Sequence, residues 1–252
     1  MTFTPLAPPL VLLAEELKRE LCQVITDAGT YAPRSRQVSI GPSELGEECT
    51  RKLAYKLLDW PKVNEGSSGS WAAQVGTAIH SHLEGIFSKD EKYTTETKVE
   101  IRAGLKGTID LFHNERNMVL DWKTKSPAGV KEKKSHGASN KEIVQIMTYA
   151  YGKKKQGVTV DYVGLVFLPT GGQISDMHIE LFEYNEQIVL DALQRVDNIY
   201  ELLSTVDVEN NPQMWELIPT APSRMCMYCP NFQPFSKDLS VACNGDTGET
   251  NV

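Results

Sequence analysis

The sequence predicts a mixed α/β core with a helical cover. Three segments rich in β-branched and alternating apolar residues lie close together in the middle of the chain. Segments with apolar residues at three- and four-residue spacings precede and follow them, and two further strand-like segments come later. This order of elements favours one sheet with helices packed against it.

The apolar spacing predicts helices over residues 10–26, 43–61, 71–88, 141–155 and 186–203. In the first, Cys22 is expected to pack as a small apolar side chain. Ser43 is placed to cap the second helix, and Cys49 is expected to lie within it. The third helix carries His80.

Strands are predicted over residues 97–102, 105–112, 118–124, 162–168 and 177–182, the first three as a meander. Residues 125–140 contain few apolar side chains and are expected to form a long loop. We therefore divide the chain into an N-terminal helical segment (1–92), a core (93–207) and a cysteine-bearing tail (208–252).

Charge and hydropathy exclude several classes of protein. The 252 residues include 26 Lys and Arg against 33 Asp and Glu, a net charge of −7, so no global basic field is present to attract a nucleic acid. No apolar run reaches the roughly 20 residues that span a bilayer. We expect a cytoplasmic protein without a membrane partner.

One stretch of the chain is positively charged although the net charge is negative. The stretch 121–155 holds nine lysines and three acidic residues, a surplus of six positive charges. The lysines of its predicted loop could bind phosphate groups, although such a run of charged residues can also be a solvent-exposed face. The candidate DNA-binding residues are Lys125, Lys131, Lys133 and Lys134.

Acidic residues on two neighbouring predicted strands form a candidate metal site. Asp110 is expected at the end of one strand, and Asp121 and Lys123, two residues apart on the next, project from one face. Two converging carboxylates suit Mg²⁺ or Mn²⁺, which acidifies bound water and offsets charge on a phosphate ester. The alternative is that both acids are ordinary surface residues, with Lys123 paired to one of them.

Nearby helices could contribute to the same site. Gln145 and Tyr149 lie four residues apart and hence on one helix face, from which both could hydrogen-bond toward the metal site. His80 could supply an imidazole ligand. Taken singly, each of these side chains could instead have a purely structural role.

The ordered series Gly76-Thr-Ala-Ile-His80, Gly107-Thr-Ile-Asp110, Asp121-Trp-Lys123 and Gln145-Ile-Met-Thr-Tyr149 resembles the motifs of the RecB-like branch of the PD-(D/E)XK nucleases. The resemblance covers about residues 43–243 and implies a restriction-endonuclease-like core. It also implies that His80, Asp110, Asp121 and the backbone carbonyl of Trp122 bind the catalytic metal. Asp121 stands where many members have Glu.

The same resemblance assigns roles to the remaining motif residues. Lys123 would position the attacking water, while Gln145 and Tyr149 would orient the DNA backbone or the lysine. The implied activity is a metal-dependent DNA exonuclease acting on single strands or DNA ends, in recombination, repair or CRISPR-like DNA processing. The sequence holds no GxxxxGK[ST] phosphate loop, so unwinding would need a helicase or recombination partner.

Four of the five cysteines form a second candidate site. Cys226 and Cys229 make a CxxC pair, Cys243 lies fourteen residues further on, and Cys49 lies far upstream. Four thiolates can hold either zinc or a 4Fe-4S cluster, and spacing alone does not separate these. One cysteine before the core and three after it resemble the iron-sulfur members of the group, including the CRISPR-associated Cas-four type exonucleases, and favour the cluster.

That cluster is expected to be structural and to pin the tail to the second helix. Cys243 is the weakest ligand because its gap is long, and it could be a free thiol. Two rival interpretations remain: a noncatalytic DNA-binding subunit that keeps the fold, and a zinc-stabilised protein whose motif series is coincidental.

Overall fold

The computed structural model describes residues 8–30, 40–64 and 71–246. Its helices are α1 (Pro8–Thr30), α2 (Pro42–Leu45), α3 (Thr50–Leu57), α4 (Trp71–Phe87), α5 (Pro127–His136), α6 (Asn140–Lys155) and α7 (Glu186–Val206). Its strands are β1 (Tyr93–Arg102), β2 (Leu105–His113), β3 (Met118–Lys125), β4 (Tyr162–Pro169) and β5 (His178–Glu183). Every predicted strand is present within a few residues of its expected bounds.

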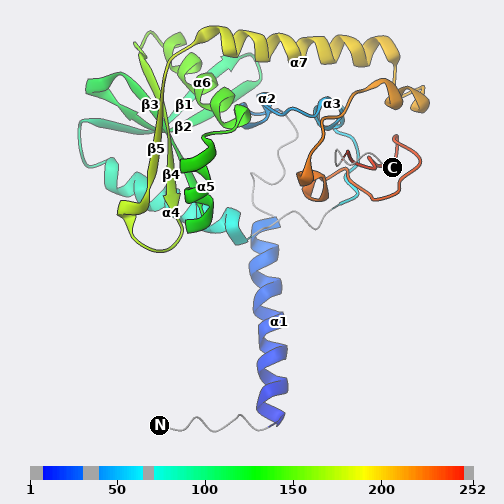
Figure 1. The fold of residues 1–252 in the computed structure, drawn as a ribbon, viewed down its shortest axis with the longest axis horizontal. Helices are drawn as coiled ribbons and strands as arrows, with labels where there is room; N and C mark the ends of the chain where they lie inside the picture. Colours follow the sequence, from blue (N-terminus) through cyan, green and yellow to red (C-terminus); the bar gives the residue numbers. More distant parts are fainter. Residues whose placement is uncertain (1–7, 31–39, 65–70, 247–252) are drawn as a thin grey trace.

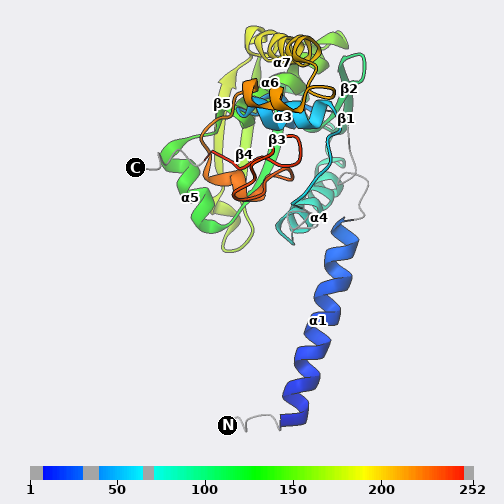
Figure 2. The same cartoon turned by 90° about the vertical axis from the view of Figure 1, so that its right-hand side faces the viewer.

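The five strands form one sheet in the order β1-β2-β3-β4-β5. All neighbours are antiparallel except β3 and β4, which are parallel and joined by the crossover through α5 and α6. The predicted meander of the first three strands is therefore confirmed, and so is the mixed α/β class. This is the restriction-endonuclease-like arrangement of a mixed sheet flanked by helices (Figures 1 and 2).

Helices cover both faces of the sheet. On one face, α6 and α7 bury a core with the strands that includes Ile109, Phe112, Ile146 and Val196. On the other face, α4 packs over a smaller cluster centred on Trp122. Residues near the middle of β2 and β3 are therefore buried between two layers, where a charged side chain needs a partner.

The tail packs against α3. The ring of Tyr55 stacks on Trp215 with centroids 4.2 Å apart, and Trp60 Nε1 donates to the Ser240 carbonyl at 2.6 Å. Direct packing thus holds the tail against the second helical segment, and its attachment through a cluster stays a prediction. The boundaries of the three-part division stay a prediction.

The second predicted helix is two helices. A turn at Gly46–Cys49 separates α2 from α3, so Cys49 is the N-cap residue of α3 and does not lie within a helix. The N-cap of α2 is Gly41, so the predicted cap at Ser43 was wrong. A Cβ at Gly46 would lie 2.6 Å from the Lys141 Cα on α6, so this close backbone approach requires glycine in the turn.

The segment 125–140 was predicted to be a loop, and this was wrong, because it contains α5. The Ser126 hydroxyl accepts from Gly129 N at 3.1 Å, Pro127 opens the first turn, and Gly137 ends the helix with φ of 76°. Only Val130 is buried, which explains why apolar periodicity did not reveal the helix.

The helix α1 extends away from the rest of the molecule (Figures 1 and 2). Cys22 is exposed on it, so the prediction that this thiol packs was wrong. None of the helices in the described part of the chain is long and apolar enough to cross a bilayer.

Candidate active site

Three charged residues alternate along β3. Asp121, Lys123 and Lys125 share the face that α6 covers, and the Lys123 Nζ lies 2.7 Å from Asp121 Oδ2. The same ammonium donates to Gln145 Oε1 at 2.7 Å. The predicted common face of Asp121 and Lys123 is therefore confirmed, but both residues lie inside β3 and not at its end.

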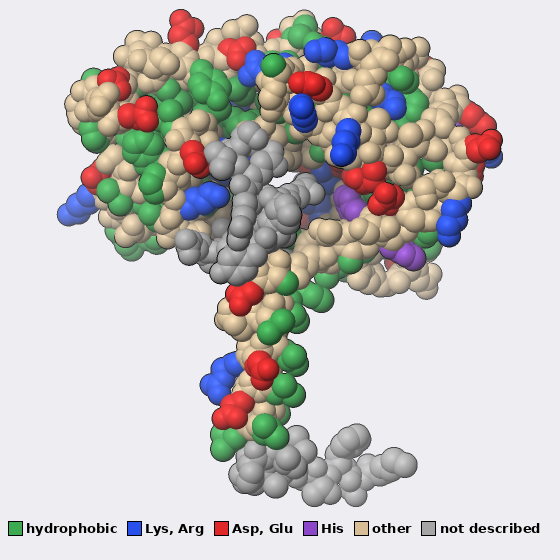
Figure 3. Space-filling model, turned by 180° about the vertical axis from the view of Figure 1, so that it is seen from behind, with side chains coloured by type: hydrophobic (Ala, Val, Ile, Leu, Met, Phe, Trp, Pro, Cys, Tyr) green, Lys and Arg blue, Asp and Glu red, His purple; other side chains and the backbone are tan. Residues whose placement is uncertain are grey.

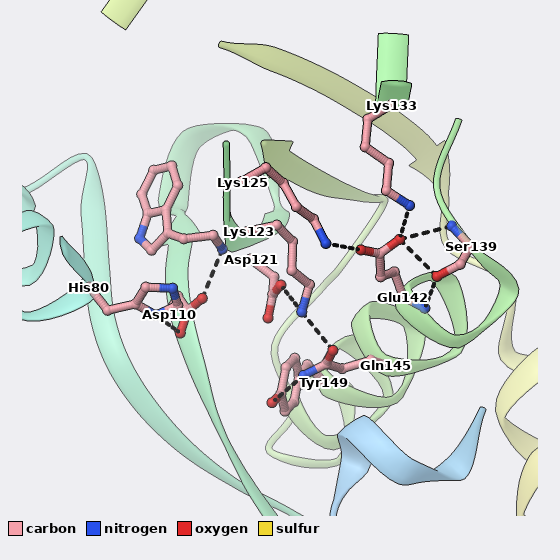
Figure 4. A network of polar contacts seen from close by, with 11 residues as sticks. His80, Asp110, Asp121, Lys123, Lys125, Lys133, Ser139, Glu142, Gln145 and Tyr149 are labelled. Atoms are coloured by element: carbon pink, nitrogen blue, oxygen red, sulfur yellow. Dashed lines mark hydrogen bonds and ion pairs between the residues drawn. The ribbon is translucent and has the colours of Figure 1, made fainter. Parts of the chain in front are cut away.

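The helix α6 continues this chain of contacts (Figure 4). Gln145 Nε2 donates to the Tyr149 hydroxyl at 3.0 Å, as expected for side chains four residues apart. The Tyr149 ring lies against Gly107 of β2, where a Cβ would come within 2.7 Å of the ring. Glycine at position 107, in the second motif, therefore leaves room for the Tyr149 ring.

Asp110 lies inside β2, where the strand is irregular, and not at its end as predicted. Ile109 and Phe112 both face the α6 layer, although regular alternation would put them on opposite faces. Asp110 also pairs with neither neighbouring strand, and Glu96, the residue of β1 that regular pairing would place opposite it, has φ of 48°. The ladder between β2 and β3 ends at Leu111 and Leu120.

This irregularity directs the Asp110 carboxylate into the opening between the strands. Its Oδ2 accepts from Trp122 N at 2.8 Å, and its Oδ1 lies 3.4 Å from His80 Nδ1 (Figure 4). In an extended strand the N–H and C=O of one residue point to the same side, so the Trp122 carbonyl also faces this opening.

His80 reaches the opening from α4. A Cβ at Gly76, one turn earlier, would lie 3.0 Å from Thr124 Oγ1, so glycine allows the helix to lie close to β3. Burial alone would lower the pKa of His80, but the hydrogen bond and charge of Asp110 outweigh it and raise that pKa.

Asp121 is 3% exposed. Burial and the nearby Asp110 carboxylate raise the pKa of Asp121, while the Lys123 ammonium opposes this shift. Apart from Lys123, no described group bonds its Oδ2. Two mutually repelling carboxylates, an imidazole and a backbone carbonyl are a donor set that fits Mg²⁺ or Mn²⁺.

These donors do not form a closed coordination shell. Among the residues that the structure describes, no three His, Cys, Asp or Glu side chains converge closely enough to bind one metal ion. Asp110 instead pairs with His80, and Asp121 pairs with Lys123.

The predicted DNA-binding lysines divide into two pairs. Lys125 Nζ lies 3.3 Å and Lys133 Nζ 2.6 Å from the Glu142 carboxylate, which also accepts from Ser139 N and its hydroxyl. Burial opposes ionisation of Glu142, but these partners lower its pKa to about 2. Lys131 and Lys134 are exposed on α5. Sequence reasoning missed Glu142, although Ser139-x-x-Glu142 is a readable capping box.

The four candidate cluster cysteines line one cavity of about 590 Å³ between the tail, α3 and the start of α6, and Lys125 and Lys133 line it too. Backbone donors lie near two of the sulfurs, with Gly245 N 3.4 Å from Cys243 Sγ and Asp246 N 3.4 Å from Cys226 Sγ. Burial raises the pKa of the Cys229 thiol. Cys243 thus lines the same cavity as the other three cysteines despite the long gap before it, but in the described residues no three of the four converge closely enough to hold one metal ion.

Arg51 is a buried cation beside these sulfurs. Its Nε donates to the Ile218 carbonyl at 2.9 Å, and its Nη1 lies 3.9 Å from Cys243 Sγ. None of the ion pairs among the described residues includes Arg51. A buried guanidinium without a carboxylate fits thiolate ligands, which would supply the compensating negative charge.

Comparisons with known proteins agree with this fold. A family model for the PD-(D/E)XK nuclease superfamily matches residues 36–231. Among solved structures, an alkaline exonuclease (LHK-Exo) from Laribacter hongkongensis is 12% identical with a TM-score of 0.50, covering 73% of this chain and 97% of its own. The structure of LHK-Exo in complex with dAMP is 13% identical with a TM-score of 0.50, and the match covers 73% of this chain and 96% of the LHK-Exo chain. No curated protein matches the sequence.

The two solved structures are similar in fold, and the family model covers most of the sequence, from residue 36 to residue 231. The matched span contains all four sequence motifs and the residues that surround Asp110 and Asp121. The chain therefore belongs to the PD-(D/E)XK nuclease superfamily.

Proposed function

We propose that this protein is a divalent-metal-dependent DNA exonuclease that hydrolyses phosphodiester bonds at DNA ends, with single strands as the preferred substrate. The observation that carries the proposal is the continuous chain Asp121–Lys123–Gln145–Tyr149 beside Asp110. Two buried or half-buried carboxylates in an irregular part of a sheet are unfavourable in a purely structural core, so their presence favours a functional role.

The metal ligands are His80, Asp110, Asp121 and the Trp122 carbonyl. A bound Mg²⁺ or Mn²⁺ would supply an acidified water and offset negative charge on the phosphate. Asp110 and Asp121 provide the negative field that attracts the cation, and the Asp110 bond to Trp122 N fixes the neighbouring peptide.

Lys123 positions the nucleophile. Its ammonium has three protons, and Asp121 and Gln145 take two directions, which leaves one toward the attacking water or a phosphate oxygen. Gln145 holds Lys123 in place and is itself held by Tyr149, so these two residues orient the lysine.

The lysines of α5 and β3 bind the DNA backbone. Lys131 and Lys134 are free to contact phosphates, whereas Lys125 and Lys133 would exchange part of their contact with Glu142 for phosphate oxygens. We expect Lys131→Gln with Lys134→Gln to reduce the slope of log Kd against log salt by about 1 for single strands. An unchanged slope would remove both lysines from the interface.

Cys49, Cys226, Cys229 and Cys243 hold a 4Fe-4S cluster with a structural role, with zinc as the alternative. The shared cavity, the N–H donors near sulfur and the unpaired Arg51 support an anionic thiolate site. The biological setting that fits such an enzyme is recombination, repair or CRISPR-like DNA processing, with a partner helicase supplying unwound strands.

The decisive experiment is digestion of end-labelled single and double strands of both polarities with Mg²⁺ or Mn²⁺. The purified protein should release nucleotides from one or both ends, and Asp110→Ala and Lys123→Ala should each abolish release while binding to DNA is retained. Wild-type activity in both variants would overturn the site. A folded protein that binds DNA and never cleaves it would instead be a noncatalytic subunit.

The cluster is tested separately by metal and acid-labile sulfide analysis of anaerobically purified protein. We expect iron with a visible absorbance band, and zinc without colour would support the alternative. Cys226→Ala should lower stability and solubility more than activity per folded chain. Cys22→Ala, on the exposed face of α1, is the control and should change neither.

A further inference from the structure

The helix α1 carries an apolar stripe that nothing in the described chain covers. We define this stripe as Val11, Ala14, Leu17, Leu21, Val24 and Ile25, whose five side chains larger than alanine are between 41% and 61% exposed. Figure 3 shows hydrophobic side chains along one side of α1 with charged side chains on another side. Solitary exposed leucines are ordinary, but a stripe along about four turns marks an interaction surface.

The stripe ends beside an open apolar groove on α4. The groove has a volume of about 470 Å³ and is lined by Trp71, Gln74, Val75, Ala78, Ile79 and His82. Gln74 Nε2 donates to the Ile25 carbonyl at 2.9 Å, which joins the groove to the C-terminal end of the stripe. Trp71 is 66% exposed there. The two surfaces are therefore continuous.

We propose that a second copy of this chain covers this surface, through an antiparallel pairing of the two α1 helices. Ala14, Leu17, Leu21 and Val24 have the alternating spacing of three and four residues that brings side chains into a helix–helix seam. An antiparallel pair centred on Arg19 puts Leu17 opposite Leu21 of the second copy and Ala14 opposite Val24. Ala14 then faces the larger Val24, so the seam has no layer as narrow as an Ala14–Ala14 pair.

A parallel pair fits less well for two reasons. It would place Ala14 against Ala14 and leave a narrow layer next to a wide one at Leu17. It would also bring both globular bodies to the same end of the helix pair, because each body is attached where α1 ends (Figures 1 and 2). Antiparallel pairing keeps the bodies at opposite ends, and it also places Val11 opposite Ile25 along one edge of the seam.

The contact combines the α1 seam with the groove on α4. A helix of 23 residues is about 35 Å long, but only one of its faces lies in the seam, and specific interfaces use roughly 20–30 residues a side. In the antiparallel arrangement the N-terminal end of the second helix lies at the end of the stripe next to Trp71. The groove on α4 would then enlarge the contact beyond the two helices.

The test is the mass of the full-length protein in solution by light scattering over a range of concentrations. We expect the mass of two 28.1 kDa chains. Leu17→Glu with Leu21→Glu should give single chains with unchanged helical content and unchanged nuclease activity per chain. Gln23→Glu with Thr26→Glu adds the same charge on the polar face and should stay dimeric.

The orientation is tested by cross-linking in a Cys22→Ser background. Mixed Leu17→Cys and Leu21→Cys chains should form a disulfide-linked pair under mild oxidation, whereas Leu17→Cys chains alone should not. A protein that is monomeric at all concentrations, or a dimer that survives both glutamates, would overturn the proposal. Because mass and cleavage are separate measurements, failure of the dimer and failure of the exonuclease remain distinguishable.

Discussion

The ammonium of Lys123 lies between Asp121 Oδ2 and Gln145 Oε1, 2.7 Å from each. It thereby links the central strand of the sheet to the helix that covers it. Gln145 in turn is fixed by Tyr149. The position of the lysine is set by this buried amide as much as by the carboxylate, so the site depends on a residue that need not touch the metal.

Gln145→Leu is therefore expected to lower kcat by about 10- to 100-fold, because a misplaced catalytic group costs rate even when the fold is kept. The dissociation constant for DNA should change little. Single-turnover digestion at saturating DNA measures the first quantity, and fluorescence anisotropy measures the second. Gln156→Leu makes the same chemical change at the end of α6, where the Gln156 side chain donates to the Lys98 carbonyl, and should not change kcat. Equal rates for both variants would contradict the role of Gln145.

A second prediction concerns Gly107, where an added Cβ would lie 2.7 Å from Tyr149 Cε1 and 2.8 Å from Pro42 Cγ. Gly107→Ala should lower the free energy of unfolding by about 1–3 kcal/mol through overpacking and should reduce activity by moving Tyr149. Gly85→Ala is the matched control, because nothing lies within 4 Å of its Cβ position in α4. It should raise stability by about 0.5–1 kcal/mol. Denaturant unfolding compares the two variants.

The parts of the site that follow local periodicity could be predicted from the sequence. A spacing of two on a strand and of four on a helix fixes which side chains share a face, which is why Asp121–Lys123 and Gln145–Tyr149 were found. The helix α5 was missed because its capping residues, and not an apolar stripe, define it.

Other features depend on contacts between distant segments and carry no local signal. Glycine is needed at position 46 because α6 passes close to it, and the position of Asp110 depends on how β2 departs from both neighbouring strands. The position of Arg51 beside Cys243 likewise follows from the packing of α3 on the tail.

A third prediction follows from Glu142, whose pKa is lowered from 4.5 to about 2 by Lys133, Ser139 and Lys125 against the opposing effect of burial. Because the folded pKa is depressed, the stabilisation is complete above the unfolded pKa and is lost as pH falls from about 4.5 to about 2. Glu142→Gln should cost about 1–3 kcal/mol at pH 7. That difference from the wild type should stay constant down to pH 5 and shrink below it.

Chemical unfolding at several pH values measures this difference. Glu132→Gln is the control, since its side chain is exposed on α5, and it should change stability by less than about 0.5 kcal/mol at every pH. If the cost of Glu142→Gln were the same at pH 3 as at pH 7, the ion pairs with Lys133 and Lys125 would not be the source of the stabilisation.

The last prediction separates thiolates from free thiols at the cysteine site. If the four cysteines bind an anionic cluster, Arg51 is the nearest buried positive charge that balances it, and Arg51→Met should lower the iron retained per chain as well as the melting temperature. If the cysteines are free thiols, the variant loses its bond to the Ile218 carbonyl and a weak contact with the Cys243 thiol, a cost of about 1–3 kcal/mol without a loss of iron. Arg51→Lys keeps the charge and should retain more iron than Arg51→Met. Iron analysis and thermal melting of the three proteins decide the question, because equal iron in all three would mean that the guanidinium balances no charge at these sulfurs.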